Sequence, residues 1–301
     1  MANLKTFHQP FVSATLACLL LLIPSVASAK VIKEQRSMYR NIFVEDKKNI
    51  RCLKFSVKRK VSSQSCIDKE EPNRLVFDYT KFVFAGLLVN PNPESVLIIG
   101  LGGGTLSNSL QLLFPDIKVD NVEIDPAVVS VAKEYFDFKE SDNIRTFNQD
   151  GRIFIKRAGI KKQQYDLIIL DAFNGEYIPE HLLTREFLQE TKALLSEDGV
   201  VVANTFSSSL LYHHETATYH DVFGDFYTVT KANNSGNRII LAATNLPDEG
   251  TLFNRVKDWQ QPLEQLDVDM KYTASLIERQ AQEESDYRVL TDQYSPANLL
   301  Q

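Results

Sequence analysis

The stretch from Val96 to Thr105, VLIIGLGGGT, constrains the fold of this chain more than any other part of it. Four apolar residues run directly into a glycine-rich turn, and leucines at helical spacing follow. This pattern predicts a buried strand, a tight turn and a helix. A turn with so little side-chain bulk lets backbone N–H groups approach a ligand at a helix N-terminus. We therefore expect Gly100, Gly102 and Gly104 to contribute to a ligand site.

A second apolar run ends about twenty residues later at Glu123, within NVEIDP. An acid at the end of the second strand of such a unit is placed to accept hydrogen bonds from ribose hydroxyls. Asp125 followed by Pro126 predicts the start of the next helix, because aspartate is a favoured N-cap and proline suits the first helical position. Together these features indicate a nucleoside-binding α/β domain.

Strand patterns and helical patterns alternate from residue 73 to residue 243. The alternation predicts an α/β fold with a mostly parallel, doubly wound sheet whose ligands lie at the carboxyl ends of the strands. We expect the segments 226–230 and 238–243 to close this sheet as an antiparallel pair. The earlier predicted strands are 96–99, 143–147, 165–170 and 199–205, and the predicted helices are 73–89, 126–135, 152–158, 179–195 and 207–223.

The chain divides by pattern into four parts. Residues 30–72 contain β-rich runs with short polar breaks, which predict a small antiparallel β domain. Residues 73–245 form the predicted nucleoside-binding domain. Residues 246–301 are charged and predicted to be helical from 252 to 287, and their apolar, proline-containing end indicates an extension that docks on the body.

The first part, residues 1–29, has the pattern of a secretory signal peptide. A basic start precedes an apolar run from Phe11 to Ile23, and small residues end at Ala29. A run of about 13 residues is too short to span a membrane. We expect cleavage after Ala29 and an exported protein, periplasmic or secreted, without a stable membrane span. The alternative is a translation start at Met38, which gives a cytoplasmic protein.

Cys52 and Cys66 remain once this segment is removed. A turn centred on Arg59 places them opposite each other in an antiparallel hairpin. Facing cysteines in an exported hairpin predict a disulfide, and two buried free thiols are the alternative.

The charge balance and the histidines exclude two kinds of site. The formal net charge is −6, and nucleic-acid binding needs clustered Lys and Arg, so we expect no nucleic-acid partner. His213, His214 and His220 fall on one predicted helix but point in different directions, so we assign no metal site. We place His181 at the surface rather than against a substrate.

Three acids, Glu123, Asp150 and Asp171, stand at or just after the ends of predicted strands. Their convergence on one crevice indicates a site in which Glu123 suits a ribose. Asp150, which precedes Gly151, suits the exocyclic amine of a base. Asp171 lies where a transferring group would sit.

Several segments resemble the spermidine synthase family, also called polyamine aminopropyltransferases. They are VLIIGLGGGT, VEIDPAVVSVAKEYF, the Asp150-Gly151 pair, YDLIILDAF and LLTREFLQETKALLSEDGVVVANTF. The resemblance covers about residues 31–243 and implies a Rossmann-like, class I methyltransferase-like sheet with a small N-terminal antiparallel β domain. DAFNGEYIPEHLLTREF and LTDQYSP resemble most the spermidine-synthase-like bacterial subgroup.

The resemblance also implies roles for individual residues. The glycine turn would hold the amino-acid-like end of S-adenosylmethionine or of its decarboxylated form, and Gln64 and Tyr79 would line the cofactor and amine pocket. Asp171 matches the first carboxylate of the family's D-S-S-D-P-like motif, while the second falls on Asn174. A histidine of the family is replaced by Thr80.

The change at Asn174 bears on mechanism, because an amide cannot accept a proton from the attacking amine. Glu176, two residues on, is the predicted replacement carboxylate, and the alternative is that it is merely exposed. The leading function is transfer of an aminopropyl or related group from a sulfonium nucleoside to a small-molecule amine. A methyltransferase and a nucleoside-binding protein without turnover stay open as alternatives, as does a homodimer.

Overall fold

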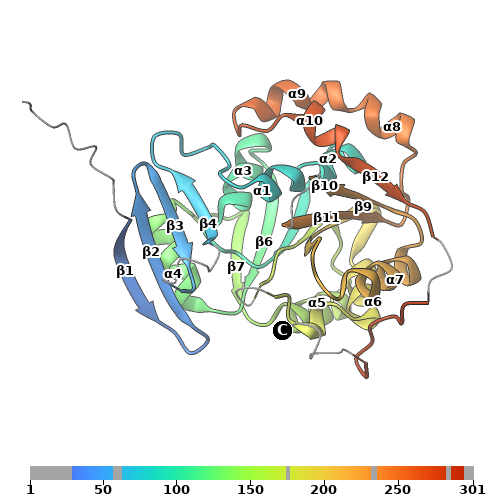
Figure 1. Cartoon of the computed structure of the whole chain (residues 1–301), viewed down its shortest axis with the longest axis horizontal. Coiled ribbons are helices and arrows are strands. Elements are labelled where there is room, and N and C mark those ends of the chain that lie inside the picture. Colours follow the sequence, from blue (N-terminus) through green and yellow to red (C-terminus); the bar gives the residue numbers. More distant parts are fainter. Residues whose placement is uncertain (1–28, 57–62, 174–176, 232–235, 283–285, 295–301) are drawn as a thin grey trace, which may run out of the picture.

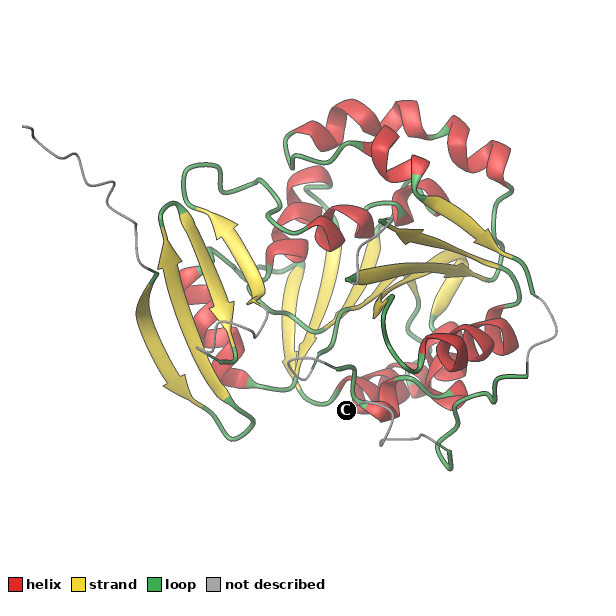
Figure 2. Ribbon diagram, viewed as in Figure 1, coloured by secondary structure: helices red, strands yellow, loops and turns green. Residues whose placement is uncertain are grey.

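The structure, a computed structural model, describes residues 29–56, 63–173, 177–231, 236–282 and 286–294. Two sheets organise these residues, one with four strands in the order β1-β2-β3-β4 and one with eight in the order β12-β10-β11-β9-β8-β5-β6-β7. The small sheet stands at one end of the molecule, and helices cover both faces of the large sheet (Figures 1 and 2).

The small sheet is antiparallel and packs its apolar face on helix α4. Ile42, Val44 and Leu53 are fully buried there, because they meet Val128 and Phe136 of the helix region. The bounds are β1 Lys30–Arg36, β2 Asn41–Lys47, β3 Ile50–Lys54 and β4 Ser63–Asp68. Cys52 of β3 lies directly opposite Cys66 of β4, and the two form a disulfide. The division of the chain at residue 72 stays a prediction.

The large sheet is parallel over β7, β6, β5, β8 and β9, and antiparallel over β11, β10 and β12. This confirms the predicted mostly parallel, doubly wound α/β sheet with a separate small antiparallel sheet. The chain leaves β5 toward β6 on one side and returns to β8 on the other, so a crevice opens at the carboxyl end of β5. The bounds are β5 Ser95–Ile99, β6 Lys118–Glu123, β7 Ile144–Asn148, β8 Tyr165–Leu170, β9 Leu195–Phe206, β10 Phe226–Thr230, β11 Asn237–Ala243 and β12 Ile277–Gln280.

Two apolar layers hold the helices on the large sheet. Alternate residues of β5 face opposite layers. Val96 and Ile98 belong to the layer that includes residues of α1 to α4 and α8 to α10, and Leu97 and Ile99 belong to the layer that includes residues of α5 to α7. The helices are α1 Asp78–Val83, α2 Gly86–Val89, α3 Thr105–Leu113, α4 Pro126–Tyr135, α5 Gly151–Ile160, η1 Glu180–Leu182, α6 Arg185–Lys192, α7 Tyr212–Phe223, α8 Glu249–Asn254, α9 Val256–Glu264 and α10 Met270–Ser275. Within the described ranges, no helix combines the length and the apolar character that crossing a membrane requires.

Four predicted helices differ from the structure. The helix predicted over 73–89 begins only at Asp78 and is divided into α1 and α2. The helix predicted over 179–195 is divided, because the buried Thr184 leaves the helical path and caps α6 by accepting a hydrogen bond from the N–H of Phe187. The helix predicted over 207–223 begins only at Tyr212. The helical prediction for 252–287 is wrong at Ile277–Gln280, which pairs antiparallel with β10 and covers that edge of the sheet.

Candidate functional site

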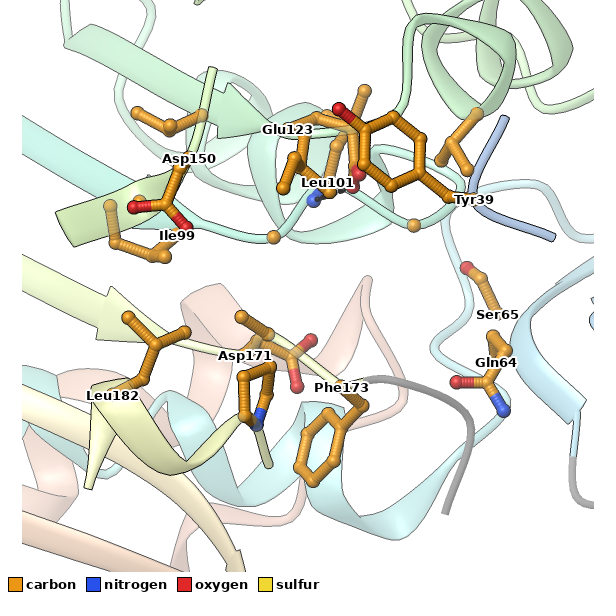
Figure 3. A pocket seen from close by; sticks show the side chains of 18 of the residues that line it. Tyr39, Gln64, Ser65, Ile99, Leu101, Glu123, Asp150, Asp171, Phe173 and Leu182 are labelled. Atoms are coloured by element: carbon orange, nitrogen blue, oxygen red, sulfur yellow. Dashed lines mark hydrogen bonds between the residues drawn. The ribbon is translucent and has the colours of Figure 1, made fainter. Parts of the chain in front are cut away.

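A cavity of about 330 Å³ lies where the small sheet meets the carboxyl ends of β5, β6 and β8 (Figure 3). Its walls bring together residues that are far apart in the sequence. Most of the predicted site residues line it, namely Gln64, Tyr79, Gly100, Gly102, Glu123, Asp150, Gly151 and Asp171. The sequence analysis missed Tyr39, Arg40, Phe55, Phe173 and Leu182, which line it as well.

The glycine turn after β5 forms one wall. Gly100 has a φ of 97°, and a Cβ there would collide with the backbone carbonyl of Asp171. The N–H of Gly100 donates to the carbonyl of Val122 at 2.8 Å, which holds the turn at the end of β6. Gly104 lies outside the cavity lining. It has a φ of 77° at the start of α3, and a Cβ there would meet the ring of Phe138.

Glu123 ends β6 and is fixed by two backbone hydrogen bonds. Its Oε2 accepts from the N–H of Leu101 at 3.1 Å, and its Oε1 accepts from the N–H of Asp125 at 2.9 Å. Burial raises the pKa of Glu123, and these two hydrogen bonds lower it. The acid and the glycine turn therefore hold each other in place.

Asp150 caps α5 and contacts a histidine that the sequence analysis placed at the surface. Its Oδ1 accepts from the N–H of Ile153 at 3.0 Å, and its Oδ2 lies 2.9 Å from Nε2 of His181. The His181 side chain is 47% exposed, as expected of a surface residue, and it also lines the cavity.

Asp171 stands at the end of β8, opposite the glycine turn. Its N–H donates to the carbonyl of Ile99 at 2.8 Å, its Oδ1 accepts from Nδ2 of Asn204 at 2.8 Å, and its Oδ2 accepts a long, 3.4 Å hydrogen bond from the Tyr79 hydroxyl. Burial raises the pKa of Asp171 to about 7, and the two side-chain hydrogen bonds oppose the rise. A carboxyl with a pKa near 7 is suited to exchange protons at neutral pH.

Tyr79 and Gln64 form the wall beside Asp171. The Tyr79 hydroxyl also lies 3.5 Å from the carbonyl of Gln64, and burial raises the pKa of Tyr79 well above its ordinary value. Thr80 stands where the sequence resemblance places a histidine. It is buried, and its hydroxyl donates to the carbonyl of Phe77 at 2.7 Å. Its side chain is therefore engaged within its own helix.

Two predicted residues, Asn174 and Glu176, lie outside the described residues. Among the described residues, no group of three or more His, Cys, Asp or Glu side chains is placed to hold a metal ion. The helix histidines are engaged separately. His213 stacks on Tyr287, and His214 and His220 lie at hydrogen-bond distance from the carbonyls of Arg288 and Gly224.

Comparison with solved structures agrees with this fold. The chain superposes on a probable spermidine synthase from Corynebacterium glutamicum with a TM-score of 0.65 and 18% identity, covering 86% of this chain and 99% of that one. It superposes on human methyltransferase-like protein 13 in complex with SAH with a TM-score of 0.55 and 24% identity, covering 72% of this chain and 100% of that one. At these identities, the similarity is one of fold.

Comparison of sequences gives the family. The model of the spermine/spermidine synthase domain matches residues 79–233. A polyamine aminopropyltransferase from Vibrio vulnificus is 48% identical over 288 residues, which cover 95% of this chain and 96% of the relative. One from Chromobacterium violaceum is 30% identical over 68% of this chain and 76% of its own length. With the glycine turn, Glu123, Asp150 and Asp171 around one cavity inside the matched region, this chain belongs to the spermine/spermidine synthase family.

Proposed function

We propose that the protein is an aminopropyltransferase that moves an aminopropyl group from decarboxylated S-adenosylmethionine to a small-molecule amine. The observation that carries the proposal is Asp171, a carboxyl with a pKa of about 7 that faces the cavity opposite the glycine turn. Its near-full-length relative from Vibrio vulnificus, a polyamine aminopropyltransferase, supports the same reaction.

Different residues along the cavity would bind different parts of the two substrates. Glu123 and the turn at Gly100 and Gly102 would hold the ribose and the tail of the donor, and Asp150 with Gly151 would hold the base. Gln64 and Tyr79 would line the side on which the amine enters. This arrangement would bring the methylene carbon next to the sulfonium sulfur toward Asp171.

The reaction needs a neutral amine, since a protonated amine has no lone pair with which to attack. The amine nitrogen bonds to the methylene carbon next to sulfur, the carbon–sulfur bond breaks, and its electron pair stays on sulfur to give methylthioadenosine. The proton that the amine loses passes to Asp171. Oδ2 is the receiving atom, because its hydrogen bond from Tyr79 is long, whereas Oδ1 is held by Asn204 at 2.8 Å.

Glu176 is our candidate for the second carboxylate that Asn174 does not supply. It would hold the cationic end of the amine from the loop that follows Asp171. This assignment rests on sequence alone, because residues 174–176 lie outside the described residues.

The decisive assay offers decarboxylated S-adenosylmethionine with putrescine, beside S-adenosylmethionine with a panel of methyl acceptors. Asp171→Asn is expected to lower aminopropyl transfer by about 10²-fold to 10⁴-fold while leaving methylthioadenosine affinity nearly unchanged. Glu176→Gln is expected to act in the same direction, and Asn174→Asp to raise the transfer rate. Methyl transfer alone would establish the methyltransferase alternative, and tight nucleoside binding without turnover would establish the binding protein.

We also propose that the protein is exported and cleaved after Ala29. The Cys52–Cys66 disulfide supports this, since such bonds persist in oxidising compartments. A start at Met38 would remove all of β1, Lys30–Arg36, and expose the edge of β2. Mass spectrometry of the mature N-terminus separates the two starts, because residue 30 is expected at the N-terminus after cleavage.

A further inference from the structure

Arg40 lies in the turn between β1 and β2 and lines the cavity. Ser37 fixes this turn, because its hydroxyl oxygen accepts from the N–H groups of Tyr39 and Arg40 at 3.0 Å and its hydroxyl donates to Asp125 at 2.6 Å. The turn is thereby attached to the start of α4, on the same loop as Glu123. The backbone position of Arg40 is therefore fixed by the fold.

The guanidinium group of Arg40 is held on one side only. Its central carbon lies 4.2 Å from the centre of the Phe55 ring, and its Nη1 donates to the carbonyl of Phe173 at 3.3 Å. Its Nε is buried and has no hydrogen-bond partner, and no described residue accepts from its Nη2. The edge formed by Nε and Nη2 is therefore unused by the residues that the structure describes.

The same edge binds carboxylates elsewhere in this chain. Two parallel N–H groups on one edge of a guanidinium match the two oxygens of a carboxylate. Arginines that use Nε and Nη2 in this way are Arg51 with Asp46 and Arg152 with Glu190. In the part of the chain that the structure describes, Arg40 has no ion pair, although it lines a cavity with three acids.

Those three acids are already engaged. Glu123 accepts from two backbone N–H groups, and the charge of Arg40 helps to lower its pKa without forming an ion pair with it. Asp150 contacts His181, and Asp171 is held by Asn204. The proposed substrates, a sulfonium nucleoside and an amine, are cations. A guanidinium in their cavity repels them unless an anion lies between the charges.

Arg40 lies away from Asp150, where the adenine base of the donor is proposed to bind. In Figure 3, Tyr39 and Phe173 lie at the end of the cavity that carries Gln64 and Ser65, whereas Asp150 lies at the other end. Arg40 follows Tyr39 and bonds to Phe173, so it belongs to the end that receives the tail of the donor and the acceptor.

We propose that Arg40 forms a carboxylate-binding subsite, and that one of the two substrates presents a carboxylate to its Nε–Nη2 edge. The carboxylate belongs either to the donor, as the α-carboxylate of S-adenosylmethionine, or to an acceptor that is an amino acid. The inference rests on the proposed function in so far as that function places a sulfonium nucleoside and an amine in this cavity. In the acceptor case the donor stays decarboxylated S-adenosylmethionine. In the donor case S-adenosylmethionine takes its place, the transferred group is 3-amino-3-carboxypropyl, and the same carbon–sulfur bond breaks.

Calorimetry on the full chain tests the donor first. The ligands are S-adenosylmethionine, its decarboxylated form, which lacks only the carboxylate, and methylthioadenosine, which lacks the whole tail. Arg40→Met is expected to lower the affinity for S-adenosylmethionine about tenfold to a hundredfold, as for loss of a charged hydrogen-bond partner, and to leave the affinities for the other two ligands unchanged. Arg40→Lys keeps the charge without the planar edge, so its affinity for S-adenosylmethionine is expected to lie between those of the native protein and Arg40→Met.

The acceptor is tested by rates with putrescine and with ornithine, which is putrescine with a carboxylate added. If the acceptor carries the carboxylate, Arg40→Met raises the KM for ornithine about tenfold or more and leaves that for putrescine unchanged. Arg279→Met is the matched control, because it removes an arginine that pairs with Asp225, far from the cavity.

Two results overturn the subsite. One is an Arg40→Met protein whose preference among donors and between acceptors equals that of the native protein. The other is an equal loss of affinity for all three nucleosides, which gives Arg40 a purely structural role. The subsite and the proposed function can fail separately. If Arg40→Met changes the preference among donors but the native protein transfers no aminopropyl group, the subsite stands and the proposed function is rejected.

Discussion

Asn204 donates a hydrogen bond of 2.8 Å from its Nδ2 to Oδ1 of Asp171, and this bond joins the carboxyl ends of the neighbouring parallel strands β8 and β9. The side-chain carbonyl of Asn204 in turn accepts from Nδ2 of Asn237 at 2.8 Å. One orientation of the Asn204 amide satisfies both partners, with its NH₂ group toward the carboxylate. Side chains from two strands, β9 and β11, thus hold the proposed base in place.

Replacing Asn204 by leucine removes this donor and keeps a similar volume. Because the hydrogen bond favours the carboxylate form, we expect the pKa of Asp171 to rise above about 7. The acid limb of kcat/KM then moves to higher pH by about one unit. A pH–rate profile measures the shift, with Asn245→Leu, an exposed asparagine away from the cavity, as the matched control. If the acid limb of kcat/KM stays at the same pH in Asn204→Leu, Asp171 is not the group that takes the proton from the amine.

Glu123→Ala is expected to weaken methylthioadenosine binding about tenfold to a hundredfold, since losing a charged hydrogen-bond partner costs about 1.5 to 3 kcal/mol. Glu123 also accepts from the backbone of Leu101 and Asp125, so the alanine variant removes support for the turn as well. Glu123→Gln keeps one acceptor oxygen and the side-chain volume, and it is expected to lose less affinity. Calorimetry on both variants measures this, and native affinity in both would remove Glu123 from the ribose site.

Gly104 combines a left-handed backbone with close packing. Its φ of 77° and ψ of 11° lie in the left-handed helical region, and a Cβ there would meet the ring of Phe138. Gly104→Ala is therefore expected to cost about 1 to 2 kcal/mol for the backbone conformation and roughly 1 to 3 kcal/mol more for overpacking. Urea unfolding of the variant and of the native protein measures the sum. A loss of no more than about 2 kcal/mol would show that Phe138 yields freely.

The sequence predicted the core of the site because its signals are local. The apolar strand, the glycine turn and Glu123 follow one another within a single β-α-β unit, so spacing alone places them together. Asp171 was found for the same reason, since it directly follows a buried strand. Comparison with the structure confirms the fold that these signals predicted.

The missed residues act through long-range contacts. Arg40 bonds to Phe173, 133 residues away, and Asn204 reaches Asp171 across 33 residues. Such pairs carry no periodicity, because they depend on how the small sheet and the strand order bring segments together. The edge strand Ile277–Gln280 was missed likewise, since its helical pattern was overridden by the open edge of β10.

The Cys52–Cys66 bond should contribute measurably to stability. It closes a segment with a sequence separation of 14. A loop of about 15 residues closed in this way contributes on the order of 3 kcal/mol. We expect Cys52→Ala/Cys66→Ala to lower the free energy of unfolding by about this amount. A thiol count on denatured, unreduced native protein checks the bond itself, and two reactive thiols would contradict it.

The raised pKa of Asp171 should also appear in the pH dependence of stability. The folded protein holds this proton up to about pH 7, whereas an unfolded aspartate loses it near 3.8. The stabilising contribution is therefore complete below about pH 3.8 and is lost as the pH rises to about 7.

Asp171→Asn removes this titration while keeping the size and shape of the side chain. One pKa unit corresponds to about 1.4 kcal/mol, but the carboxyl faces a cavity open to solvent, which reduces the effect. We expect native protein to lose about 1 to 3 kcal/mol more than the variant between pH 5 and pH 8. Urea unfolding of both proteins at the two pH values measures the difference. Parallel loss in the two proteins would place the pKa of Asp171 near that of an ordinary carboxyl, and its part in removing the proton of the amine would then have to be given up.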